Sequence, residues 1–155
     1  MGRSSGFLAL SAGMAGGAEL ILLPEHPMDP EEIVARLHDL HAQQRSHAIV
    51  VVAEGATWNI DRLEPYLRSE ASLPSFETRV TKLGHVQRGG APGVFDRMLA
   101  TRLGAAAVEA FEAGQRGVLI SLMEGRIRST ELATVNAQHK EFPHDLYLLA
   151  NMLAQ

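Results

Sequence analysis

Residues 47–55 read HAIVVVAEG, a continuous apolar run that ends in a carboxylate and a glycine. Such an unbroken run is typical of a strand covered on both faces, as in parallel sheets. Upstream, ELILLPE at 19–25 indicates a second buried strand, which a proline stops. Between the two, residues 29–45 open with an aspartate and a proline and carry apolar residues at helical spacing. The order strand, helix, strand predicts a parallel pair with a crossover helix.

The same alternation continues along the chain and predicts an α/β fold with a three-layer, doubly wound, mainly parallel sheet. In chain order, the remaining segments are a small apolar helix at 5–16, a short helix at 60–71 bent or interrupted at Pro65, a strand at 77–83, a long helix at 93–114, one or two strands at 117–127 and a final helix at 143–154. In such sheets, ligands gather at the carboxyl ends of the strands.

Composition limits the class of protein. The chain has 155 residues, 46% of them hydrophobic, so it forms one ordinary domain or a piece of a larger protein. A net charge of −4 without any basic run argues against a nucleic-acid partner. The absence of cysteine excludes disulfides and thiolate zinc sites and fits a cytoplasmic location. No apolar run is long enough for a membrane span, and the N-terminus lacks a secretory-signal pattern.

Glu54 and Gly55 follow the strand at 47–53. A carboxylate at this position can accept hydrogen bonds from vicinal sugar hydroxyls. It can equally cap a neighbouring element of the fold. The sequence favours neither reading over the other.

The segment TKLGHVQRGGAP at 81–92 joins a predicted strand to a predicted helix. His85 and Arg88 lie three residues apart beside glycines that permit close approach of a ligand, and Arg79 adds a third cationic side chain. A plain loop with solvated cations is the alternative. We favour an oxyanion or phosphate pocket, to which Arg3, just before the first predicted helix, adds a weaker indication.

The chemistry of phosphoryl transfer requires a phosphate cradle, a metal carboxylate and usually a base. The glycine-rich AGGAE at 15–19 precedes a strand rather than a helix, so it is not a phosphate-binding loop of the usual kind. None of the five aspartates ends a predicted buried strand, where a base would be held. The chain therefore offers anion-binding and sugar-binding groups without the donor machinery.

Five segments, in this order and spacing, resemble the C-terminal half of 6-phosphofructokinases, and the likeness extends over about residues 1–125. They are MGRSSGFLAL, AGGAE, VVVAEG, ETRVTKLGHVQRGGAP and FDRMLATRLGAAAVE. The element LGHVQRGG is highly specific to that family. The tail from residue 126 matches more loosely.

The resemblance implies a fructose 6-phosphate site made of Met1, Gly2, Arg3, Glu54, Arg79, His85 and Arg88. In that site Glu54 binds sugar hydroxyls, and His85 and Arg88 hold the 6-phosphate. Arg79 reaches the same phosphate from an adjacent subunit. Arg3 takes the catalytic role of stabilising charge on the transferring phosphoryl group.

The resemblance also implies an organisation into domains. Residues 1–82 form the small sugar-phosphate domain, 83–142 belong to the large nucleotide-side domain, and 143–155 return as a helix to the small domain. The partners implied are fructose 6-phosphate, a missing N-terminal half and further copies of the chain in a dimer or tetramer. The donor of the parent enzyme is ATP or pyrophosphate with Mg²⁺; we expect this chain alone to bind neither and to be inactive.

An allosteric effector site in the family matches Glu19, Arg45 and His47. This chain departs from the regulated bacterial pattern, because Arg45-Ser46-His47 stands where those members carry two lysines before the histidine. That departure argues against effector control of the bacterial type. The alternative function is a non-catalytic module that binds a sugar phosphate or nucleotide and regulates a partner.

Overall fold

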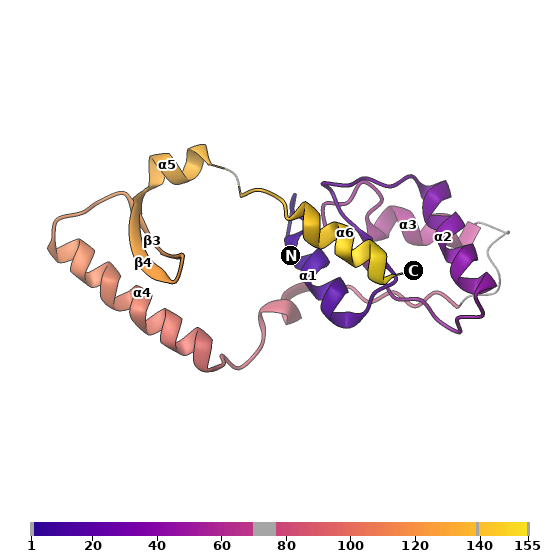
Figure 1. Cartoon of the computed structure of the whole chain (residues 1–155), viewed down its shortest axis with the longest axis horizontal. Helices are drawn as coiled ribbons and strands as arrows, with labels where there is room; N and C mark the ends of the chain where they lie inside the picture. The colour runs from indigo at the N-terminus through magenta and orange to yellow at the C-terminus, as the bar shows by residue number, and fades with distance from the viewer. Residues whose placement is uncertain (1, 70–76, 139, 155) are drawn as a thin grey trace. The chain divides into compact units, whose positions relative to one another are not determined.

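The computed structural model describes residues 2–69, 77–138 and 140–154 (Figure 1). The chain divides into two compact units. Unit 1 consists of Met1–Gln87 with Phe142–Gln155, and unit 2 consists of Arg88–Glu141.

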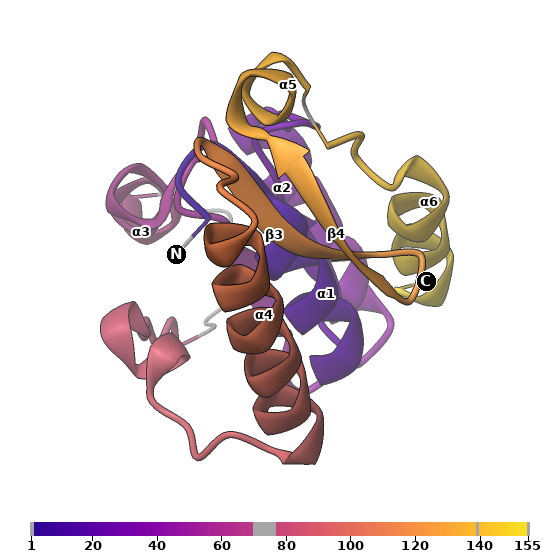
Figure 2. The ribbon, with the colours of Figure 1, turned by 90° about the vertical axis from the view of Figure 1, so that its left-hand side faces the viewer.

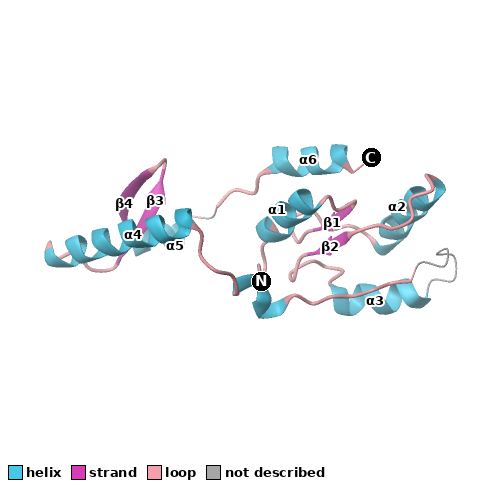
Figure 3. Ribbon diagram, turned by 90° about the horizontal axis from the view of Figure 1, so that it is seen from below, coloured by secondary structure: helices cyan, strands magenta, loops and turns pink. Residues whose placement is uncertain are grey.

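The centre of unit 1 is the predicted parallel pair with its crossover helix (Figure 3). Strand β1 (Leu20–Leu22) pairs in parallel with β2 (Val50–Val52), and Ile21 lies opposite Val51. Helix α2 (Pro30–Ala42) connects them, with Asp29 before it and two glutamates in its first turn. These acidic residues suit the positive end of the helix dipole. The sequence prediction for this part of the fold is confirmed.

Three more α-helices pack in the described part of unit 1. Helix α1 (Phe7–Gly16) packs on both strands, and α3 (Ile60–Ser69) packs on α2 and continues as a helix through Pro65. Helix α6 (His144–Leu153) closes the chain and contacts α1. The buried core residues are Leu10, Ala18, Leu20, Ile21, Leu22, Leu23, Ile33, Val34, Leu37, Leu40, Ala53, Ala56, Leu63 and Ala150. All of them belong to unit 1.

The strand predicted at 77–83 is wrong. This stretch forms no ladder with β2, although Thr78 and Val80 are half-buried and alternate with exposed neighbours, as in an extended chain. A strand must lie about 4.8 Å from its partner to form ladder hydrogen bonds. Here the stretch instead borders a concavity that β2 also lines. The chain then enters the 3₁₀ helix η1 (Gly84–Arg88).

Unit 2 contains a long helix and a hairpin (Figure 2). Helix α4 (Val94–Glu112) precedes β3 (Val118–Met123) and β4 (Arg126–Glu131), which pair antiparallel, and the short helix α5 (Leu132–Ala137) follows. The sequence pattern had not indicated α5.

The turn of this hairpin explains why its strands are antiparallel. Glu124 and Gly125 both have positive φ, 51° and 76°, as a two-residue type I′ turn requires. Such a turn reverses the chain directly, whereas a parallel pair needs a crossover. The prediction of one mainly parallel, three-layer sheet therefore holds only in part: the described residues form a mixed α/β structure with two small sheets.

Candidate functional site

A turn at the start of the chain lies against the carboxyl end of β2. The Ser5 amide donates to the Gly2 carbonyl over 3.0 Å, and Arg3 within this turn has a φ of 49°. The Arg3 amide donates to Glu54 Oε2 over 3.3 Å. A methyl group on Gly55 would lie 2.1 Å from the Arg3 carbonyl oxygen, so only glycine allows this approach. The residue predicted to be catalytic is thus carried by a turn that packs on a strand end.

Glu54 therefore serves as a local acceptor for the N-terminal turn, which was one of the two readings of its position. One oxygen of its carboxylate takes the Arg3 amide. A carboxylate offers about four acceptor sites, so this bond leaves capacity for the hydroxyls of a ligand. The two readings are compatible.

An open concavity of about 1100 Å³ lies within unit 1. It is lined by β2, α3 and the extended stretch 77–83, and its lining includes Glu54, Arg79 and His85. The walls are apolar where Val51, Leu63 and others face it, with charged residues around them. Three of the residues predicted from sequence therefore share one hollow of the molecule.

The cationic side chains of this hollow have weak partners. Arg79 Nη2 lies 3.1 Å from Glu77 Oε2, but the two side chains are 82% and 76% exposed. Lys82 pairs in the same way with Asp61, and both of these side chains are exposed. Exposed ion pairs contribute about 0–1 kcal/mol, so a bound anion could replace a carboxylate partner at little cost.

The other predicted site residues are placed as follows. Arg88 is the last residue of η1 and the first of unit 2, and it is not among the residues that line the hollow of unit 1. Gly2 belongs to the turn with Arg3, whose side chain is exposed and does not line the hollow. Met1 lies outside the described residues. The sequence reasoning missed Glu25, which receives the Gly6 amide; its position after β1, like that of Glu54 after β2, was the available signal.

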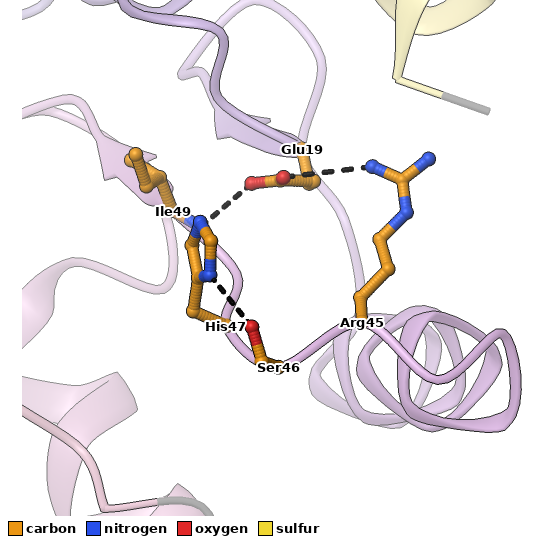
Figure 4. Close-up of polar contacts among 5 residues, drawn as sticks. All are labelled: Glu19, Arg45, Ser46, His47 and Ile49. Carbon is orange, nitrogen blue, oxygen red and sulfur yellow. Dashed lines mark hydrogen bonds and ion pairs between the residues drawn. The ribbon is translucent and has the colours of Figure 1, made fainter.

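The residues matched to an effector site lie at the opposite, amino ends of the strands (Figure 4). Glu19 Oε2 accepts the Ile49 amide over 2.7 Å, and Glu19 Oε1 lies 3.5 Å from Arg45 Nη1. The Ser46 hydroxyl lies 3.1 Å from His47 Nδ1. Both oxygens of Glu19 thus take part in contacts within the chain, which join the start of β1 to the loop before β2.

Two kinds of feature are absent from the described residues. Among residues 2–69, 77–138 and 140–154, no group of three or more histidine, cysteine, aspartate or glutamate side chains is arranged to hold a metal ion. In the same residues, no helix has the length and apolar character that crossing a membrane requires.

Comparison with known proteins gives one consistent result. A family model described as Phosphofructokinase matches residues 1–111. The chain is 43% identical over 155 residues to ATP-dependent 6-phosphofructokinase 1 of Thermus thermophilus, and the match covers 99% of this chain and 47% of that protein. An ATP-dependent 6-phosphofructokinase of Bacillus cereus is 42% identical over 154 residues, with the same coverage.

Solved structures agree. Phosphofructokinase from Pichia pastoris in the T-state matches with a TM-score of 0.71 and 36% identity, over 86% of this chain and 16% of that one. A pyrophosphate-dependent phosphofructokinase from Marinobacter aquaeolei matches with a TM-score of 0.77 and 25% identity, over 94% and 41%. The chain spans about half the length of the curated relatives named above. Because the family model covers well over half of it, the chain belongs to the phosphofructokinase family.

Proposed function

We propose that this chain is the sugar-phosphate-binding, C-terminal half of a 6-phosphofructokinase and that its ligand is fructose 6-phosphate. The observation that carries the proposal is the hollow of unit 1, whose lining includes both Glu54, just after β2, and His85. The Glu54 carboxylate can accept hydrogen bonds from hydroxyls at one end of a ligand, and the His85 imidazole can donate to a phosphate at the other.

Each residue has a role in this proposal. Glu54 accepts hydrogen bonds from sugar hydroxyls, while His85 and Arg88 donate to the 6-phosphate. Arg79 acts on the same phosphate from a neighbouring copy of the chain. Met1 and Gly2 border the sugar, and Arg3 stabilises the charge that develops on the phosphoryl group in transfer.

The parent enzyme would transfer a phosphoryl group from ATP or pyrophosphate to the 1-hydroxyl of fructose 6-phosphate. Mg²⁺ would supply charge neutralisation at the donor phosphates. In this proposal the residues of this chain bind and orient the acceptor, and the groups that would hold Mg²⁺ and the donor lie elsewhere in the parent enzyme. We expect the 155-residue chain alone to show no turnover with either donor; measurable formation of fructose 1,6-bisphosphate would contradict this.

The partner that completes the enzyme would cover unit 2. Phe95 and Phe111 of α4 are 70% and 65% exposed, and unit 2 buries none of its described residues. Large apolar side chains exposed in this number on one unit favour a surface that a partner covers. We propose that the remaining half of the enzyme, together with further copies of the chain, covers them.

The direct test is a calorimetric titration of fructose 6-phosphate into the chain, with the variants His85→Ala and Arg88→Ala. Loss of one charge-assisted phosphate contact should weaken binding by about 1.5–3 kcal/mol, roughly ten- to a hundredfold. Arg36→Ala is the matched control, since Arg36 lies on α2 in an exposed pair with Glu32. Fructose without its phosphate serves as the control ligand.

The outcomes separate clearly. Binding that either variant weakens, and that fructose does not reproduce, supports the proposed site. Binding that is equally strong in all variants would mean that fructose 6-phosphate binds elsewhere. If the chain alone does not bind, the titration is repeated with the completed enzyme; no binding there would refute the proposal.

A further inference from the structure

We infer that Glu25 is a positioning residue for the turn that carries Arg3. The inference rests on the proposed function for what the turn does, but not for how the turn is held. Glu25 is half-buried, and its carboxylate accepts the Gly6 amide with both oxygens, over 2.8 Å and 3.1 Å. The two residues are 19 positions apart in sequence, so this contact fixes one part of unit 1 on another.

The position of Gly6 explains why a carboxylate is suited to this contact. Gly6 is the N-cap of α1, and no side chain of its own caps that helix. The amides at a helix start carry a partial positive charge, and an anionic acceptor is favourable there. Glu25 therefore supplies from outside the helix the negative charge that a capping aspartate would supply from within.

The packing at this contact is close. A methyl group on Gly6 would lie 2.5 Å from Glu25 Oε2 and 2.7 Å from Leu23 Cδ2. Leu23 is 1% exposed and belongs to the core, so it has little room to move. The backbone at Gly6 is thus held between the core and the Glu25 carboxylate.

The two strand ends act together. β1 leads through Leu23 to Glu25, and β2 leads through Ala53 to Glu54. Since the strands are parallel neighbours, both carboxylates lie at the same edge of the sheet. Glu54 accepts the Arg3 amide and Glu25 accepts the Gly6 amide, three residues further along the chain.

The turn is therefore fastened at both of its ends. Arg3 has a long side chain and a left-handed backbone with φ of 49°, a conformation that is uncommon and energetically unfavourable for residues other than glycine. Fixing the backbone on each side of Arg3 restricts where its guanidinium can reach. In the proposed enzyme, these contacts hold Arg3 in position for the phosphoryl group, and Glu25 itself does not touch the substrate.

The test compares Glu25→Ala, Glu25→Gln and the control Glu32→Ala, whose carboxylate lies in an exposed pair on α2. Amide hydrogen exchange measured by NMR reports on the turn without any ligand. In Glu25→Ala, the Gly6 and Ser5 amides should exchange at least about tenfold faster, while the Leu37 amide of α2 is unchanged. Glu25→Gln keeps one acceptor oxygen and should fall between the wild type and Glu25→Ala.

Two results would overturn the inference. One is exchange at Gly6 that stays at the wild-type rate in Glu25→Ala. The other is faster exchange that is the same at Gly6 and Leu37, because that shows a general loss of stability. If Glu25→Ala does not fold, the milder Glu25→Gln decides by the same comparison.

Titration with fructose 6-phosphate separates this inference from the proposed function. If the wild type binds, Glu25→Ala should weaken the affinity about three- to tenfold, and Glu25→Gln should restore part of it. Unchanged affinity in a variant with a loosened turn would remove the link to the ligand site. If no sugar phosphate binds to any form, the proposed function fails while the exchange data still decide the role of Glu25.

Discussion

Helices α2 and α4 show how differently the two units are built. α2 buries Ile33, Leu37 and Leu40, which are 0%, 8% and 7% exposed. α4 is longer, yet no residue along it is buried, and Val94 at its start is 81% exposed. Both are well-formed helices, but only α2 contributes to a core.

The difference shows that a chain can form regular secondary structure without burying a hydrophobic core. Much of α4 is made of alanine and other strong helix formers, so its backbone conformation agrees with local preference. Its exposed apolar side chains remain in contact with water and therefore contribute little hydrophobic stabilisation. A unit of this kind gains its hydrophobic stabilisation only when a partner covers it, which is the physical basis for proposing a completing half.

The comparison is tested most strongly by removing matched side chains from each unit. Leu10→Ala should destabilise unit 1 by about 2–5 kcal/mol, because Leu10 is fully buried. Val108→Ala in α4 should change stability by less than about 0.5 kcal/mol, since Val108 is 58% exposed. Urea unfolding followed by the fluorescence of Trp58, the single tryptophan, measures the first effect, because Trp58 lies in unit 1. Amide hydrogen exchange along α4 measures the second. A large effect of Val108→Ala would mean that the α4 face is already covered in solution, for example by a second copy.

Alanine substitutions at one glycine in each unit should change stability by a smaller amount and with opposite signs. Gly55→Ala should cost about 1–3 kcal/mol, since the new methyl group would meet the Arg3 carbonyl and displace the turn. Gly104→Ala in α4 meets no atom within 4 Å and should stabilise that helix by about 0.5–1 kcal/mol. Circular dichroism during thermal unfolding gives both signs. Equal effects at the two positions would contradict the close packing of the turn on β2.

Much of unit 1 could be predicted from the sequence. The apolar runs at 19–25 and 47–55 and the helix between them produce a periodic signal that local physics determines. The strand predicted at 77–83 is the exception, because local sequence was not sufficient to decide whether it forms. Its alternating pattern is real, but whether a strand forms depends on a partner at ladder distance, which no local pattern encodes.

For the candidate site, the sequence singled out Glu54, Arg79 and His85 because they lie in or just after predicted strands, where ligands gather in such sheets. All three line the hollow of unit 1, and their roles in binding stay predictions. Glu25 was missed because it follows a proline and looks like part of an ordinary turn. Its role depends on Gly6, and that contact over 19 positions is a product of the fold.

Helix α6 belongs to unit 1 but is less buried than α2, and it provides a third test. It buries only Ala150, and an aromatic group anchors its start: the ring of His26 stacks on Tyr147 at 4.1 Å, and His26 Nε2 lies 3.2 Å from His144 Nδ1. His26→Ala removes the stacked ring and the hydrogen bond and should weaken docking of α6 by about 1 kcal/mol. Hydrogen exchange over 144–153 measures this, with His38→Ala on α2 as the control. Protection of 144–153 that is the same in His26→Ala and in the wild type would contradict this anchor and would show that other packing holds α6.

The smallest effect is expected in the hairpin of unit 2. Glu124 has a φ of 51° in a turn where asparagine before glycine is preferred, so Glu124→Asn should stabilise the hairpin by a few tenths to about 1 kcal/mol. The variant also loses the 3.7 Å pair with Arg128, but those side chains are 86% and 52% exposed and the pair contributes about 0–0.5 kcal/mol. The gain should win, and slower amide exchange in β3 and β4 would show it. Because no described residue of unit 2 is buried, its turns and helix ends carry a larger share of its stability than they do in unit 1. Unchanged amide exchange in β3 and β4 of Glu124→Asn would indicate that contacts beyond unit 2 already stabilise the hairpin.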